Sequence, residues 1–72
     1  MNKVYYKGNT IKKNSLWRLK SDGIIFNLDS IKMLVTGFVW LELNAKKGRR
    51  SYSIGCEYLL KNFDEVENDR AN

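Results

Sequence analysis

Two segments, Ser15–Ser21 and Ile24–Leu28, alternate apolar with polar residues and are separated only by Asp22 and Gly23. An Asp-Gly pair between alternating hydrophobic residues is a strong hairpin signal, because the favoured tight turn needs positive φ at both central residues. This feature constrains the chain to an antiparallel β structure with one buried face. We predict a hairpin with a two-residue turn here.

A second pair of segments, Val39–Asn44 and Ser51–Gly55, is joined by the basic turn Lys46–Arg50. Each turn fixes which residues face each other, and a slip of one residue would move the apolar set to the other face. The predicted facing pairs are Leu19 with Phe26, Trp17 with Leu28, Leu43 with Tyr52, and Leu41 with Ile54. Both hairpins then present their apolar side chains on a single face.

Further extended segments are predicted at Val4–Tyr6, Thr10–Lys13 and Ile31–Thr36. In the last of these, alternate residues are apolar, as in a strand that buries one face, and the set is Ile31, Met33 and Val35. Near the C-terminus, Cys56–Phe63 has its apolar residues at helical spacing. We predict a short helix there that plugs one end of a barrel with Leu59 and Phe63.

Short strands about ten residues apart, with turns between them, are typical of a small barrel. For a chain of 72 residues we predict an all-β fold, a single SH3-like barrel of five or six antiparallel strands with a short C-terminal helix. An oligonucleotide-binding-type barrel, which usually needs more residues, is the alternative. We expect residues 1–66 to form this domain and residues 67–72 to form a frayed acidic and polar tail.

The composition argues against catalysis and against metal binding. There is no histidine and only one cysteine, Cys56, so neither a four-ligand zinc site nor a Ser-His or Cys-His pair can form. The clustered carboxylates lie in the C-terminal tail, where nothing would desolvate them and raise their pKa. We predict that the protein is not an enzyme and has no cofactor, and that Cys56 is a buried small hydrophobe.

No N-terminal apolar run resembles a signal peptide. No stretch approaches the roughly 20 apolar residues that a membrane span needs. We therefore expect a cytoplasmic protein without a membrane partner.

Two stretches resemble a known group of proteins. They are Ser15–Lys20 (SLWRLK) after the turn that contains Gly8, and Glu57–Val66 (EYLLKNFDEV). Both are similar to stretches of small SH3-like accessory proteins of bacteriophages, whose opening strand and terminal helix bracket the barrel. The resemblance implies this fold and a viral accessory role in the host cytoplasm, such as host takeover or anti-defence. It carries over no catalytic or binding residue.

Basic residues concentrate in the first third of the chain and in the second hairpin turn. Met1–Ser21 has six basic residues and no acid, and the whole chain has a formal net charge of +5. Such charges can hold phosphates while an aromatic ring stacks on bases, although they can also do no more than keep a turn soluble. The candidate nucleic-acid ligands are Lys12, Lys13, Arg18, Lys20, Lys46, Lys47, Arg49 and Arg50, with Tyr5 as a stacking residue.

Phe38 and Trp40 indicate a different function. If Val39 and Leu41 point inward, Phe38 and Trp40 point outward and form an apolar patch of the kind that marks partner surfaces. We therefore predict a small non-catalytic module that binds DNA or RNA. The alternative is an inhibitor or adaptor that binds a host enzyme or defence complex through Phe38 and Trp40. An unpaired edge strand or this patch could also pair two copies of the chain.

Overall fold

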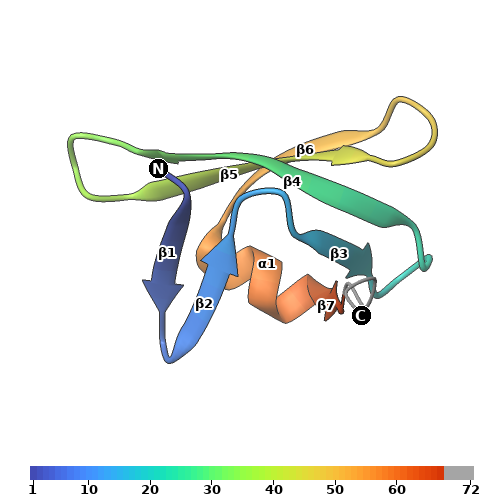
Figure 1. Ribbon diagram of the computed structural model, residues 1–72, viewed down its shortest axis with the longest axis horizontal. Helices are drawn as coiled ribbons and strands as arrows, with labels where there is room; N and C mark the ends of the chain where they lie inside the picture. The colour runs from blue at the N-terminus through green and yellow to red at the C-terminus, as the bar shows by residue number, and fades with distance from the viewer. Residues whose placement is uncertain (68–72) are drawn as a thin grey trace.

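The computed structural model of the protein describes residues 1–67 (Figure 1). The strands are β1 (Lys3–Tyr6), β2 (Asn9–Lys12), β3 (Leu16–Leu19), β4 (Ile25–Met33), β5 (Val39–Ala45), β6 (Ser51–Gly55) and β7 (Phe63–Val66), and the helix is α1 (Cys56–Asn62). The predicted frayed tail falls mainly on residues 68–72, which lie outside the described part of the chain. Strands β1 and β2 match the predicted segments to within one residue.

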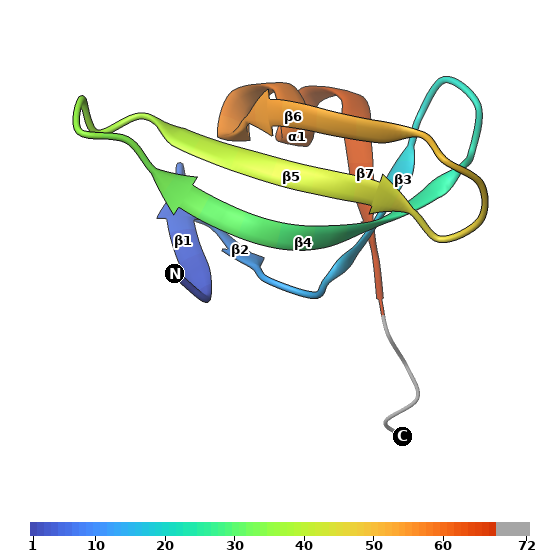
Figure 2. The ribbon, with the colours of Figure 1, turned by 90° about the horizontal axis from the view of Figure 1, so that it is seen from above.

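The five strands from β3 to β7 form one antiparallel sheet in the order β6-β5-β4-β3-β7, while β1 pairs with β2 in a separate hairpin. The sheet is strongly curled, so that β4, β5 and β6 cross the top of the molecule and β3, β7 and α1 lie below them (Figures 1 and 2). The prediction of a small all-β antiparallel barrel with a short C-terminal helix is confirmed, in the form of a half-barrel with an extra hairpin.

Strand β4 corrects the prediction of two separate strands, Ile24–Leu28 and Ile31–Thr36. It is continuous from Ile25 to Met33, with an irregularity in its pairing to β5 between Leu28 and Ser30. The extra residue of a bulge shifts the in-and-out alternation by one. Leu28 and Ile31 therefore both face the core although they are three residues apart. The carboxylate of Asp29, at the bulge, accepts hydrogen bonds from the side-chain amides of Asn27 and Asn44.

The register of the first hairpin differs from the prediction by two residues. Trp17 lies opposite Phe26, because the loop is the four-residue segment Lys20–Gly23 instead of a two-residue turn. In this loop only Gly23 has positive φ, and Asp22 accepts a hydrogen bond from the backbone N–H of Ile24. A shift of two keeps every side chain on its predicted face. In the second hairpin all the predicted facing pairs are confirmed.

The C-terminal segment was predicted as a helix up to Phe63, but the helix ends at Asn62 and Phe63 begins β7. Strand β7 pairs with the free side of β3, with Phe63 opposite Leu19. This pairing satisfies backbone groups that a short helix would leave to solvent. Leu59 and Phe63 are 0% and 2% exposed, which confirms that these two residues fill the core.

The core lies on the concave side of the half-barrel. Its buried residues are Ile11, Trp17, Leu19, Phe26, Leu28, Ile31, Leu41, Leu43, Ile54, Cys56, Leu59 and Phe63. The Trp17 indole N–H donates to the Ser15 hydroxyl at 2.8 Å, so its one polar group is satisfied. Cys56 is buried as predicted, and burial raises the pKa of its thiol.

No helix formed by residues 1–67 is both long enough and apolar enough to cross a membrane.

Candidate binding surfaces

The turn between β5 and β6 presents the basic residues that were predicted from the sequence. Gly48, with φ of +94°, lets the chain reverse at the tip, and Lys46, Lys47 and Arg49 are placed around it. None of these three forms an ion pair with an acidic residue among residues 1–67. Their charges are therefore balanced only by solvent ions, which a phosphate backbone would displace.

Arg50, the fourth basic residue of this turn, is used within the fold. Its guanidinium donates to the Asp22 carboxylate at 2.7 Å and to the Tyr52 hydroxyl at 2.8 Å. It also lies 5.8 Å from the ring centroids of Phe26 and Tyr52. The backbone N–H of Ile24 and the Arg50 guanidinium lower the pKa of Asp22, and the same pairing raises that of Arg50. Arg50 thus joins the β3–β4 loop to the β5–β6 turn.

An apolar groove of about 530 Å³ begins beside the basic turn, and we refer to it as the cation-edged groove. It is lined by Leu16, Ile24, Ile25, Lys46 and Lys47. The lysines stay beside the hydrophobic residues because the Lys46 backbone N–H donates to the Ile25 carbonyl at 3.0 Å. Apolar walls with cations at one end suit a ligand that is flat or apolar in one part and anionic in another.

Arg18 and Lys20 extend the basic surface along β3. Arg18 pairs with Ile25 on one side and with Asp64 of β7 on the other, and its side chain is exposed. The Lys20 ammonium donates to the Lys61 carbonyl at 3.2 Å and lies 3.9 Å from the Asp64 carboxylate. Lys20 is therefore partly neutralised by β7, whereas no ion pair joins Arg18 to a described acid.

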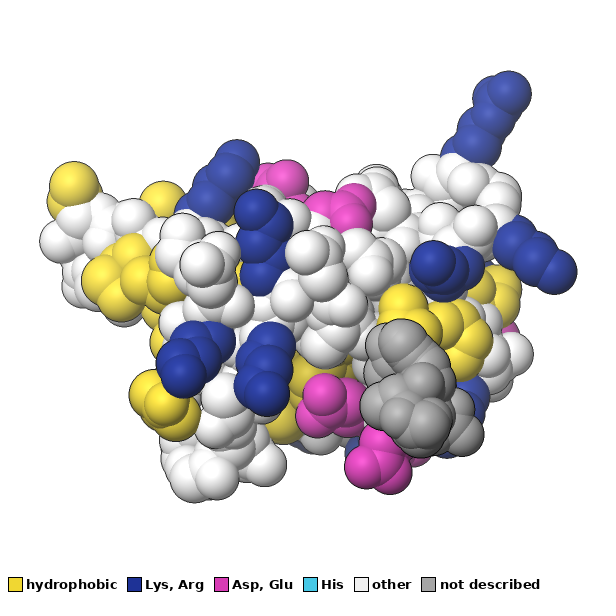
Figure 3. Space-filling view, viewed as in Figure 1, with side chains coloured by type: hydrophobic (Ala, Val, Ile, Leu, Met, Phe, Trp, Pro, Cys, Tyr) yellow, Lys and Arg dark blue, Asp and Glu magenta, His cyan; other side chains and the backbone are white. Residues whose placement is uncertain are grey.

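The β1–β2 hairpin carries a second basic group. Lys3 lies directly opposite Lys12, and Lys13 follows. Like charges that face each other across two strands are destabilising, so the pair is costly unless an anion binds there. Tyr5 is 68% exposed, and the Lys3 ammonium lies 5.6 Å from its ring centroid. Lys and Arg side chains extend over the viewed face from this hairpin to the β5–β6 tip, with acidic side chains between them (Figure 3).

The end of the β4–β5 hairpin projects beyond the rest of the molecule (Figure 2). We define this arm as Met33–Trp40. Its exposed hydrophobic residues, with their exposed fractions, are Met33 at 54%, Leu34 at 41%, Val35 at 105%, Phe38 at 49% and Trp40 at 36%. Phe38 and Trp40 are exposed as predicted, and their rings meet edge to face with centroids 5.3 Å apart.

Met33 and Val35 correct a prediction, because they were expected to face inward with Ile31. Strand β3 pairs with β4 only over Ile25–Asn27, and beyond Ile31, the last buried residue of β4, the strand has β5 beside it but no core beneath it. The alternation of apolar residues in Ile31–Thr36 therefore does not indicate which of them are buried. Leu34 was also not identified from the sequence as part of the exposed apolar surface. The available signal was an apolar side chain next to Val35 in a turn.

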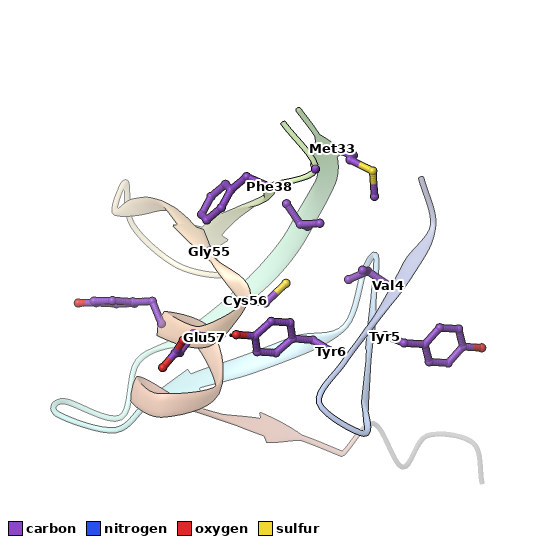
Figure 4. Close-up of a pocket in the computed structure, with 11 residues that line it drawn as sticks. Val4, Tyr5, Tyr6, Met33, Phe38, Gly55, Cys56 and Glu57 are labelled. Carbon is purple, nitrogen blue, oxygen red and sulfur yellow. Dashed lines mark hydrogen bonds between the residues drawn. The ribbon is translucent and has the colours of Figure 1, made fainter. Parts of the chain in front are cut away.

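A hollow of about 570 Å³ separates the arm from the β1–β2 hairpin (Figure 4). Val4, Tyr6, Met33, Phe38 and Cys56 are among the side chains that line it. The Phe38 ring lies over Gly55, where a Cβ atom would be only 2.8 Å from the ring. At its floor the Tyr6 hydroxyl donates to the Glu57 carboxylate at 3.3 Å. The apolar surface of the arm thus continues into the hollow.

Within residues 1–67 no three His, Cys, Asp or Glu side chains gather as a metal site would require. Comparisons with protein-family models, with curated protein sequences and with solved structures found no match. They identify no family for the chain. The resemblance to bacteriophage accessory proteins rests on the sequence patterns alone.

Proposed function

We propose that this protein is a small non-catalytic module that binds the phosphate backbone of a nucleic acid. The observation that carries the proposal is the cation-edged groove, where Lys46 and Lys47 adjoin an apolar floor. Arg49 follows in the same turn, and none of the three forms an ion pair within residues 1–67. Cations would hold phosphates and the apolar floor would receive a base or sugar. The phage-type accessory role, in the cytoplasm of a host cell, is the wider context in which we place this activity.

Further contacts in this proposal come from Lys12, Lys13 and Arg18, which extend the basic surface on β2 and β3. Tyr5 supplies a stacking surface at the β1–β2 hairpin, where 68% of the residue is open to solvent. Lys20 and Arg50 contribute through positioning, because their charges are already engaged by Asp64 and Asp22. A single strand fits this arrangement best, since its bases are free to stack.

The test is fluorescence anisotropy of labelled single-stranded DNA, duplex DNA and RNA titrated with the protein. Lys47→Ala/Arg49→Ala should weaken binding for every sequence tested and reduce the salt slope by about 0.7 per lost contact on a single strand. The matched control is Lys7→Ala/Lys61→Ala, which removes the same charge from the β1–β2 turn and from α1. If the two variants lost the same affinity, the effect would come from net charge alone, and this would contradict the proposal.

A second candidate function is binding to a partner protein through the arm. The observation that favours it is the set of exposed apolar side chains around Phe38 and Trp40, with the hollow beside them. Exposed apolar surface of this kind marks interaction sites, and tryptophan is frequent among the residues that dominate binding. An inhibitor or adaptor that binds a host enzyme or defence complex would use this surface.

This candidate is tested by placing a photoreactive amino acid at Val35, the most exposed hydrophobic residue of the arm, in cells that express the protein. One discrete cross-linked partner is expected from position 35 and none from Lys7, the control. Trp40→Ala should abolish the adduct while leaving the protein folded. Adducts of equal yield from both positions, or from neither, would contradict the arm as a partner surface.

A further inference from the structure

Strand β6 is one edge of the five-stranded sheet. The Ala45 N–H donates to the Arg50 carbonyl at 2.9 Å, and antiparallel pairing alternates from there. Arg50, Tyr52 and Ile54 therefore bond to β5, while the backbone groups of Ser51, Ser53 and Gly55 point away from the sheet. Among residues 1–67 no strand pairs with that side of β6.

The sequence of β6 lacks the usual protection of an edge strand. Natural edges carry charged side chains, proline or a bulge that prevents pairing with another chain. The opposite edge, β7, has Asp64 and Glu65. Strand β6 reads Ser-Tyr-Ser-Ile-Gly, with no charge, no proline and a regular register to β5. Ser51 and Ser53 are exposed, so this edge is accessible.

We propose that two copies of the chain pair through β6, antiparallel, about a two-fold axis at Ser53. This register sets Ser51 opposite Gly55 of the second copy, so that all the outward backbone groups of the strand find partners. It extends the sheet continuously from one copy into the other. The occupant of the edge is thus a second copy of this protein.

The side chains of β6 are complementary to themselves in this register. On the concave side Tyr52, which is half-buried, faces Ile54 of the second copy, an aromatic and β-branched pair that stabilises sheets. The neutral serine on the axis allows the close approach. These features favour a second copy over an unrelated extended peptide.

The experiment is sedimentation equilibrium of the whole chain over a range of concentrations. We expect a concentration-dependent mass that rises from 8.5 kDa to twice that value. On the two-fold axis, residue 53 of one copy lies opposite residue 53 of the other. Ser53→Lys and Ser53→Asp should therefore each give monomers, because two like charges would face each other. An equimolar mixture of the two variants should restore the dimer, because lysine then faces aspartate.

A dimer that returns in the mixture shows that each variant had lost the interface and not the fold. Because Glu42 lies opposite Ser53 on β5, a charge at residue 53 could also affect folding, and circular dichroism of each variant checks this. Glu65→Pro is the matched control, because it alters the other edge and should leave the dimer intact. A wild-type monomer at about 1 mM would overturn the proposal. So would a dimer that survives both Ser53 variants, or a mixture that stays monomeric.

Discussion

Arg50 is the residue that most changes how the basic turn is understood. Its sequence neighbours suggest a phosphate ligand, yet its guanidinium is held by Asp22, Tyr52 and two aromatic rings. The charge of Arg50 fixes one loop against another, and Lys46, Lys47 and Arg49 remain unpaired within residues 1–67. A count of basic residues cannot make this distinction, because it depends on where Asp22 lies in space.

The Asp22–Arg50 contact predicts a pH-dependent stability. The pKa of Asp22 is lowered in the folded state, so its contribution is full at neutral pH and is lost as the pH falls through the lowered pKa. Asp22→Asn should lower the Tm at neutral pH, and the gap to wild type should close in acid. Thermal unfolding followed by circular dichroism measures this, with Glu65→Gln as the control. A gap that stays constant into acid would contradict the role of the Asp22 charge.

Among the strands, β7 is the one whose existence and partner could not be predicted from the sequence. Both hairpins were predictable, because turn glycines and alternating residues are local signals. The partner of β7 is β3, more than forty residues earlier in the chain, and nothing local in Phe63–Val66 indicates it. The apolar spacing of Leu59, Leu60 and Phe63 fits a helix. Phe63 leaves the helix because its backbone pairs with the distant strand β3. The bulge at Asp29 was hidden for a similar reason, since it is defined by the register with β5.

Phe63 should be among the most sensitive positions in the chain. Its ring is 2% exposed and meets those of Phe26 and Tyr52 edge to face, with centroids 5.7 and 5.8 Å away. Phe63→Ala should cost about 3–5 kcal/mol, enough to unfold much of so small a domain. Urea denaturation measures this loss. Tyr58→Ala, at a residue that is 50% exposed on α1, is the control, and equal losses would show that Phe63 is not part of the core.

The contact between Gly55 and the Phe38 ring of the arm can be tested by substitution. An alanine there fits the backbone, with φ of −88°, but its Cβ would lie 2.8 Å from the Phe38 ring. Because the exposed ring can swing outward, Gly55→Ala should change stability by less than about 1 kcal/mol while breaking the contact. Loss of the nuclear Overhauser effect between residue 55 and the Phe38 ring reports this. Gly48→Ala, at φ of +94°, should do the reverse, losing stability and keeping the contact. An unchanged Phe38 contact in Gly55→Ala would contradict the packing described.

At the scale of the whole molecule, the two candidate surfaces are at different ends of the half-barrel. The cation-edged groove adjoins the β5–β6 turn, and the arm projects from the other end of β4 and β5 (Figure 2). The sequence was enough to predict the basic turn and, on the condition that Val39 and Leu41 point inward, the outward direction of Phe38 and Trp40. It could not predict the groove, the hollow or the extent of the arm, because each is formed by residues that are distant in the chain.

The most direct measurement is the binding of labelled single-stranded DNA to the protein at several salt concentrations. A surface that makes four to six phosphate contacts gives a slope of log Kobs against log[salt] of about −3 to −4, at roughly −0.7 per contact. We expect such a slope, with micromolar or tighter binding at low salt. No binding at about 50 mM salt, or a slope near zero, would contradict the proposed phosphate-binding function.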